Sequence, residues 1–157
     1  MADNKLRKLI VAYLQEAKMM QLATVGADGR PWVCNVWFAV DKDLNVYWFS
    51  ATTRRHSKEI LQNSHVAAAI CLPRGPEDAS RGGIQLEGTA KVLTKPTEVA
   101  VAMKYYVGRK IFTASQVADF MKHVTKPHRF YKITPSSIVL FDTVHYPDES
   151  RQELTLG

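Results

Sequence analysis

The sequence of 157 residues lacks the features that would place it in a membrane or outside the cell. No apolar run approaches the roughly 18 residues that a membrane-spanning helix needs. The apolar stretch after the charged start is interrupted by Gln15, Glu16 and Lys18, so it does not have the form of a secretory signal peptide. We therefore expect a cytoplasmic protein that does not associate with a membrane.

Cysteine is also scarce. The two cysteines, Cys34 and Cys71, are too few for a disulfide framework and have no metal-ligand spacing. They fit a reducing compartment. Each lies inside an apolar run, where a free thiol usually packs as a small hydrophobic group. We therefore expect no metal site.

The motifs of the common catalytic sites are missing as well. The sequence contains no G-x-S-x-G, H-E-x-x-H or C-x-x-C motif and no P-loop. The pair Gly82-Gly83 lacks the rest of a dinucleotide-binding fingerprint, and the five histidines lie far apart in the sequence. A catalytic site built from side chains alone is not visible, so we predict no catalytic residue.

What the chain does have is an ordinary globular composition and an excess of positive charge. Hydrophobic residues make up 46% of it, and its length suits one compact domain, which we assign to residues 1–157. It carries 21 Lys and Arg against 15 Asp and Glu, a formal net charge of +6, which suits an anionic ligand. Because the basic residues are dispersed and no nucleic-acid motif accompanies them, we do not expect a nucleic-acid partner.

The hydrophobic pattern predicts strands with helices inserted between them. Spacings of three and four residues, with capping signals, predict helices near 6–17, 52–63, 95–108 and 115–124. Apolar and alternating runs predict about six strands, drawn from 20–25, 32–40, 45–50, 65–72, 84–92, 129–133 and 137–142. Consecutive antiparallel hairpins favour a mainly β barrel over a doubly wound sheet.

Two local features add to this prediction. Gly88 lies inside a strand-like run, which indicates a bulge or the close approach of another backbone. The last stretch of the chain, from about residue 146, is polar, and we expect it to be a loose tail.

Residues 50–58 join the end of a strand to the start of a helix and are rich in hydroxyl and basic side chains. A helix N-terminus offers free backbone N–H groups and a partial positive charge, so it favours an anion. Arginine adds a guanidinium that can hold two phosphate oxygens at once. The segment therefore indicates a phosphate site, although the same residues also fit a capped helix whose basic side chains are solvated.

A group of aromatic residues lies next to this segment, in the predicted hairpin. Its members are Trp32, Trp37, Phe38, Tyr47, Trp48 and Phe49. Aromatic-rich strands usually belong to a protein core, but they can also line a slot for a planar ring. Beside a phosphate candidate they suggest an aromatic cofactor with one phosphate. FMN is such a molecule.

Five blocks of residues follow one another in an order and spacing that are typical of a known family. They are Val36-Trp37-Phe38, Tyr47-Trp48-Phe49-Ser50, Arg55-His56-Ser57, Gly83-Ile84-Gln85-Leu86-Glu87-Gly88-Thr89-Ala90 and Ile133-Thr134-Pro135. From about Leu6 to Asp142 the chain resembles the pyridoxamine 5′-phosphate oxidase-like superfamily of FMN-binding split barrels. The resemblance implies a six-stranded antiparallel split β-barrel with inserted helices, and a homodimer with FMN between the subunits.

The resemblance also implies which residues bind the cofactor. The matching positions are Asn35, Val36, Trp37 and Phe38 along the flavin ring; Phe49, Ser50, Arg55, His56 and Ser57 at the phosphate; and Gln85, which reaches the flavin from the partner subunit. His56 departs from the lysine that is common in the family. Because a neutral imidazole carries no charge, phosphate binding is expected to weaken as pH rises.

The resemblance does not extend to the substrate. True pyridoxamine 5′-phosphate oxidases have a C-terminal Trp and an Arg-rich substrate clamp, and neither has a match after Asp142. We expect an FMN-dependent oxidoreductase that acts with an electron donor on some other small molecule. Two alternatives stay open on the same barrel: a non-enzymatic flavin carrier or sensor, and a protein that binds haem or a deazaflavin.

Overall fold

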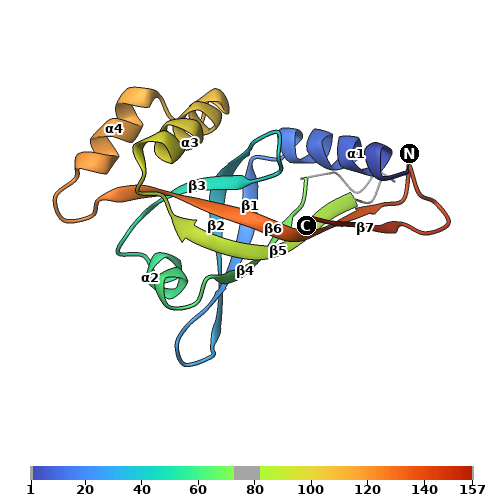
Figure 1. The fold of residues 1–157 in the computed structure, drawn as a ribbon, viewed down its shortest axis with the longest axis horizontal. Coiled ribbons are helices and arrows are strands. Elements are labelled where there is room, and N and C mark those ends of the chain that lie inside the picture. Colours follow the sequence, from blue (N-terminus) through green and yellow to red (C-terminus); the bar gives the residue numbers. More distant parts are fainter. Residues whose placement is uncertain (1, 73–81, 157) are drawn as a thin grey trace.

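The computed structural model describes residues 2–72 and 82–156 (Figure 1). The helices in these ranges are α1 (Ala2–Glu16), α2 (Arg55–Gln62), α3 (Pro96–Gly108) and α4 (Ala114–Lys122). The strands are β1 (Met19–Val25), β2 (Pro31–Val40), β3 (Val46–Ala51), β4 (His65–Ile70), β5 (Gly82–Val92), β6 (His128–Asp142) and β7 (Arg151–Thr155). Each of the four predicted helices is present.

The strands form one antiparallel sheet that closes on itself. Its order is β3-β2-β1-β4-β5-β6-β7, and β6 also pairs with β3, so the first six strands make a barrel. Residues 128–133 of β6 pair with β3, whereas residues 137–141 pair with β7. The predicted mainly β, six-stranded split barrel is therefore confirmed, with β7 as an additional strand.

The C-terminal part differs from the sequence expectation in two respects. The two short strands expected near 129–133 and 137–142 are one continuous strand, β6, because a bulge at Ser136 absorbs the irregularity without breaking the strand. The expected loose tail contains β7, which pairs with β6 and buries Leu154. A polar segment becomes ordered here because its backbone groups find partners on β6.

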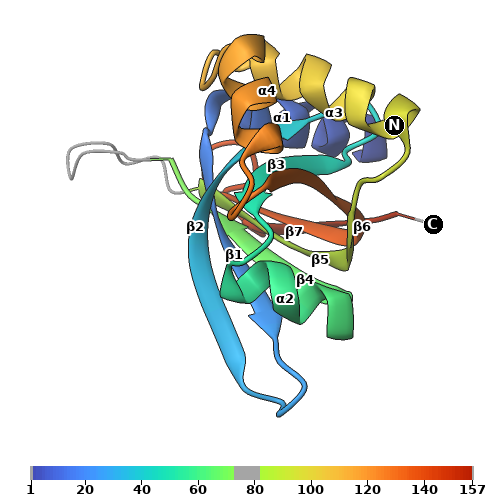
Figure 2. The same ribbon diagram turned by 90° about the vertical axis from the view of Figure 1, so that its left-hand side faces the viewer.

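β3 is buried along its whole length because it has packing partners on both faces. Val46 and Trp48 belong to the barrel core, whereas Tyr47 and Phe49 belong to a second apolar cluster formed with α3 and α4. Figure 2 shows the two helices lying over this strand. The strand that leads into α2 is thus held from two sides.

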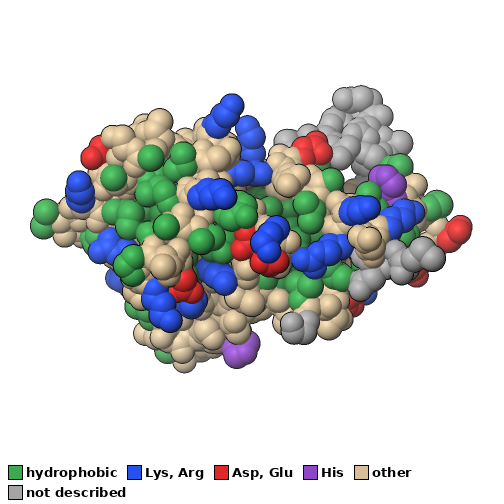
Figure 3. Space-filling model, turned by 45° about the horizontal axis from the view of Figure 1, so that its top comes forward, with side chains coloured by type: hydrophobic (Ala, Val, Ile, Leu, Met, Phe, Trp, Pro, Cys, Tyr) green, Lys and Arg blue, Asp and Glu red, His purple; other side chains and the backbone are tan. Residues whose placement is uncertain are grey.

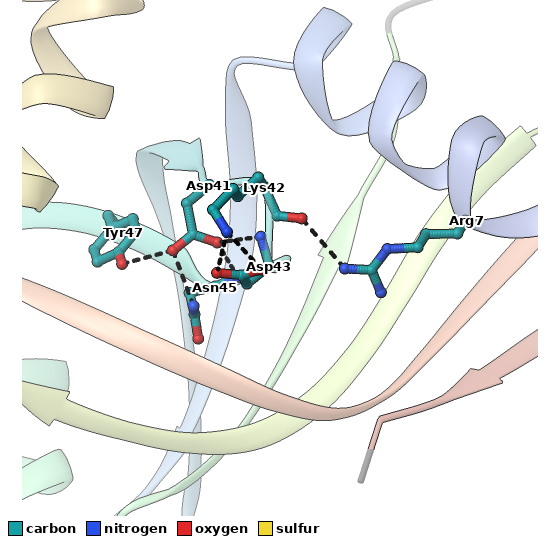
Figure 4. Close-up of polar contacts among 6 residues, drawn as sticks. All are labelled: Arg7, Asp41, Lys42, Asp43, Asn45 and Tyr47. Atoms are coloured by element: carbon teal, nitrogen blue, oxygen red, sulfur yellow. Dashed lines mark hydrogen bonds and ion pairs between the residues drawn. The ribbon is translucent and has the colours of Figure 1, made fainter. Parts of the chain in front are cut away.

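One carboxylate holds the turn between β2 and β3 (Figure 4). Asp41 accepts hydrogen bonds from the backbone N–H groups of Asp43 and Asn45 and from Asn45 Nδ2, all at 2.9 Å, and from the Tyr47 hydroxyl at 2.8 Å. Burial and the bond to Asp41 raise the pKa of Tyr47. Leu44 in this turn has a φ of 68°, which non-glycine residues rarely adopt, so the turn depends on such support.

The predicted bulge and close backbone approach at Gly88 are both present. The register between β5 and β6 shifts between Glu87 and Gly88. A Cβ atom added to Gly88 would lie 2.2 Å from Thr134 O and 2.7 Å from Pro135 Cα. No side chain fits at this crossing.

Replacing this glycine is therefore expected to destabilise the barrel. Gly88→Ala should lower the free energy of unfolding by about 1–3 kcal/mol, the usual cost of forcing atoms into a packed region. Urea denaturation followed by circular dichroism measures the change. Gly108→Ala is the control, because nothing lies within 4 Å of an added Cβ there, and it should leave the stability unchanged or raise it. Equal stabilities of the Gly88→Ala variant and the wild type would contradict the prediction.

Candidate functional site

The first part of the candidate site is an open strand edge. β2 pairs with β1 from Pro31 to Trp37, but it pairs with β3 only from Phe38 to Val40. Along residues 31–37 its second edge has no strand partner within the described part of the chain. Alternate residues of a strand direct their N–H and C=O groups to each edge. This edge therefore offers hydrogen bonds to a planar polar ligand.

The four residues predicted to follow a flavin ring lie on or beside this edge. Val36 and Phe38 turn into the barrel and are buried, whereas Asn35 and Trp37 are exposed on the outer face. Gln21 Nε2 donates to Asn35 Oδ1 at 3.1 Å. A ligand on this strand would meet its backbone and the two exposed side chains.

The second part is the N-terminus of α2. The first hydrogen bond within the helix runs from the Lys58 N–H to Arg54 O at 3.1 Å. The N–H groups of Arg55, His56 and Ser57 precede it and so have no acceptor within the helix. Arg54 is the N-cap residue and makes no side-chain cap hydrogen bond. The first turn contains no acidic residue. This helix end therefore carries the positive end of the dipole without a resident anion among its own residues.

Arg55 is held by a buried carboxylate and an indole ring. Its Nε donates to Glu59 Oε1 at 2.7 Å, and its guanidinium carbon lies 4.5 Å from the centre of the Trp32 ring. Thr24 Oγ1 donates to the other Glu59 oxygen at 2.5 Å. Although burial alone would raise the pKa of Glu59, the bonds from Thr24 and Arg55 lower it. The bond to Glu59 uses Nε and leaves the two Nη nitrogens of a side chain that is 45% exposed.

His56 and Ser57 point inward. His56 Nδ1 lies 3.3 Å from Cys34 Sγ, and its Nε2 is buried with no partner within residues 2–72 and 82–156. Burial, and then the charge of Arg54, lower the pKa of His56, so its ring is neutral at pH 7. Burial raises the pKa of Cys34 to about 11, so the thiol keeps its proton. Ser57 Oγ donates to Ala51 O at 2.9 Å. These side chains fasten α2 to the barrel, and only their backbone N–H groups face the helix end.

The remaining predicted site residues lie elsewhere. The ring of Phe49 packs under α3 and α4, 4.7 Å from that of Phe130, and Ser50 is buried. Gln85 is aligned across the sheet with Asn35, because Asn35 pairs with Gln21, Gln21 with Ala69 and Ala69 with Gln85. Three strand spacings separate Asn35 and Gln85, which is roughly 14 Å. Within one chain, Gln85 does not join the group at α2.

The sequence did not predict the group that holds Arg55 in place. Its members are Thr24, Trp32 and Glu59. Arg55 and Glu59 have the i, i+4 spacing of helical ion pairs, so that contact was detectable in the sequence. Thr24 and Trp32 come from β1 and β2, and only the closure of the barrel brings them to α2.

A cavity of about 620 Å³ lies beside Trp37 on the outer face of the sheet. Ala17, Met19 and Leu72 contribute apolar walls, and Lys18 and Gln21 contribute polar groups. Its volume is in the range of small-molecule sites.

The described residues lack two other kinds of feature, a metal-binding cluster and a membrane-spanning helix. No cluster of three or more His, Cys, Asp or Glu in those ranges has a metal-binding arrangement. No helix there is long and apolar enough to cross a membrane. On the face drawn in Figure 3, Lys and Arg side chains are scattered among hydrophobic and acidic ones.

Comparison with known proteins identifies the family. Residues 6–141 match the family model described as pyridoxamine 5′-phosphate oxidase. The chain belongs to the pyridoxamine 5′-phosphate oxidase family. The predicted superfamily is thus confirmed over most of the chain. No match was found among curated protein sequences.

Solved structures share the fold at low sequence identity. General stress protein 26 from Bacillus anthracis is 18% identical with a TM-score of 0.65, over 96% of this chain and 98% of that one. A haem-binding protein from Mycobacterium smegmatis is 14% identical with a TM-score of 0.70, over 92% of this chain and 56% of that one. The haem storage protein HutZ from Vibrio cholerae is 19% identical with a TM-score of 0.65, over 82% and 88%. At such identities the likeness shows the fold alone.

The buried imidazole of His56 has a consequence for acid stability. Because its folded pKa lies below the ordinary value, the unfolded chain binds a proton there that the folded chain does not. The free energy of unfolding should therefore fall as pH drops below about 6.5. His56→Gln should reduce this pH dependence, whereas His65→Gln, on an exposed histidine of β4, should not.

Denaturation series across the acid range test this prediction. An NMR titration that places the pKa of folded His56 at or above the unperturbed value would contradict it, whatever the stability of the variants.

Proposed function

We propose that this protein is an FMN-dependent oxidoreductase that acts on a small molecule. The observation that carries the proposal is that two sets of polar backbone groups lie close together. One is the edge of β2 along residues 31–37, which has no strand partner among the described residues, and the other is the N-terminus of α2, whose first turn has no acidic residue. The first suits the polar rim of a planar ring, and the second suits a phosphate. Membership of the family supports the same ligand.

The residues present fit a flavin phosphate. The N–H groups of the first turn of α2 and the exposed side chain of Arg54 offer donors, and Arg55 adds two Nη nitrogens held in place by Glu59 and Trp32. Guanidinium groups bind phosphate oxygens in pairs. His56 and Ser57 would contribute backbone N–H groups, because their side chains are buried.

The residues along β2 fit the ring. Asn35 and Trp37 would flank it with an amide and an indole, while the backbone of β2 would bond its rim. The buried residues Val36 and Phe38 would keep the strand rigid. FMN, when bound, supplies the hydride or electron transfer, and the chain supplies binding, orientation and exclusion of water. The cavity beside Trp37 is the place we propose for the substrate.

We also propose that the protein works as a homodimer. The outer face of the sheet exposes Val33 (59%), Trp37 (42%) and Phe141 (43%), large apolar side chains that a second copy would cover. Gln85 lies on this face, three strand spacings or roughly 14 Å from Asn35. A partner subunit would bring its own Gln85 to the flavin.

The absorption spectrum of the purified protein is the first test of the cofactor. We expect flavin bands and the release of FMN on heating, and a protein stripped of flavin should rebind FMN. Arg55→Gln should weaken FMN binding about tenfold or more, because a hydrogen bond to a charged group is lost. Leu61→Gln, an exposed residue at the far end of α2, is the control.

The same spectrum separates the alternatives. A haem Soret band without flavin bands would contradict the proposal in favour of a haem-binding protein. A bound flavin that is not reduced by NADH or NADPH, or by any other donor tried, would favour a carrier or sensor over an enzyme.

Light scattering after size-exclusion chromatography tests the dimer. Two chains of 17.7 kDa give about 35 kDa for the wild type. Phe141→Glu should shift the mass toward one chain, since it places a charge on the proposed interface. Val124→Glu, at a 93% exposed residue outside the sheet, should not. A wild-type protein with the mass of one chain would contradict the homodimer.

A further inference from the structure

The C-terminal end of α1 is joined to the end of α3 by one side chain, although more than 90 residues separate the two ends in the sequence. Arg109, the C-cap residue of α3, donates from Nη1 to Gln15 O at 2.6 Å and from Nη2 to Ala17 O. Figure 1 shows the two helix ends facing each other. Arg109 therefore holds α1 at the point where the chain turns into β1.

The two carbonyls are suited to a cation. The last C=O groups of a helix have no partner within it and carry the negative end of its dipole. The last turn of α1 contains no basic residue of its own, so Arg109 supplies this charge from a distant segment. Its guanidinium carbon also lies 5.6 Å from the centre of the Phe38 ring. A planar fork can bind two carbonyls and lie against a ring at once, whereas a single ammonium cannot.

The segment that Arg109 holds is a wall of the cavity beside Trp37. Residues 16–19, which run from the end of α1 into β1, all line this cavity. Arg109 holds the backbone at the start of this segment. Further along, the Phe38 N–H donates to Lys18 O at 3.1 Å. The wall is thus fixed to both α3 and β2.

α1 also holds a second part of the cavity lining. The Leu72 N–H donates to the Tyr13 hydroxyl at 3.2 Å, and Leu72 and Cys71 line the cavity. Tyr13 lies one helical turn before the contact with Arg109, since the Ala17 N–H donates to Tyr13 O at 3.0 Å. A displacement of this end of α1 would therefore move two parts of the lining together.

We infer that Arg109 is a positioning residue for the substrate cavity, and that through it α3 sets the size of the substrate that the cavity admits. The inference rests on the proposed function, which assigns this cavity to the substrate. Arg109 is not among the described residues that line the cavity, so it acts through the backbone that it binds. The side chains of Met19, Trp37 and Leu72 in the lining suit a planar apolar ring.

Hydrogen exchange followed by mass spectrometry tests whether Arg109 holds the wall. In Arg109→Gln the amides of residues 14–20 should exchange about fivefold faster than in the wild type, because the end of α1 loses the fork that binds its carbonyls. Exchange in α2 and β4 should be unchanged. Arg109→Lys keeps the charge without the fork and should exchange at an intermediate rate. If Arg109→Gln does not fold, Arg109→Lys decides the matter.

The oxidation of photoreduced flavin in the protein by quinones, without oxygen, tests the effect on the cavity. The probes are tetramethyl-1,4-benzoquinone and 2,3-dimethyl-1,4-naphthoquinone, planar acceptors of one and two rings whose quinone positions are blocked against attack by Cys71. Each takes two electrons and two protons and becomes a hydroquinone. In Arg109→Gln the apparent Kd of the two-ring quinone should rise about fivefold and that of the one-ring quinone by less than about twofold, because the larger ring needs more of the wall. The limiting rate should stay within about twofold of the wild type.

Two control variants separate this role from charge and from stability. Lys104→Gln removes the same unit of charge from an exposed residue of α3 and should behave like the wild type. Gly88→Ala is expected to destabilise the barrel at a position outside the cavity lining. It should leave the ratio of the two quinone affinities unchanged.

The outcomes separate this inference from the proposed function. A wild type that binds no flavin would overturn the proposed function, and the role of Arg109 in substrate selection with it. A wild type that binds flavin, with unchanged exchange in both Arg109 variants, would leave that function standing and overturn the inference. Faster exchange with unchanged quinone affinities would show a structural role alone and would overturn it as well.

Discussion

The ladder between β3 and β6 closes the barrel, and the position of the candidate site depends on it. Six residues of each strand pair, from Val46 with Ile133 to Ala51 with His128. Because β3 turns toward β6, it leaves β2 after a short pairing and exposes the edge of residues 31–37. The same ladder carries the α4–β6 loop to the start of α2. The open edge and the basic helix end are therefore two results of one closure, supported by the burial of β3 on both faces.

A buried carboxylate, that of Glu59, sets the charge balance at the start of α2. Glu59 accepts from Thr24 and Arg55, so its charge is paired and hydrogen-bonded, as a buried charge requires. The pair removes one positive charge from the helix end but holds Arg55 against Trp32. Beside it, the protonated thiol of Cys34 and the neutral ring of His56 add no net charge. Arg54, the N-cap residue, is exposed, and Arg55 keeps its two Nη nitrogens.

The residues predicted to bind FMN fall into two groups, those with exposed side chains and those with buried side chains. Asn35 and Trp37 are exposed beside the open strand edge, and Arg55 is at the helix start. Phe49 and Ser50 are buried, and the side chains of His56 and Ser57 face the barrel. A motif match assigns positions along the chain, but it does not assign the direction in which each side chain points. That direction follows from the alternation of β3 and from the face of α2 that packs against β1 and β2.

The sequence by itself determined the class of fold, the helices and most strands, the special role of Gly88 and the family, because periodicity, turn residues and block order are local properties of the chain. The tertiary structure decided what depends on contacts between distant segments. β7 is ordered only because β6 offers it an edge, and β6 runs unbroken because the bulge opposite Gly88 absorbs the irregularity. His128 pairs with Ala51 only because the barrel closes, since no spacing relates residues so far apart. Local sequence encodes conformation, whereas the neighbours of a side chain are set by how the whole chain packs.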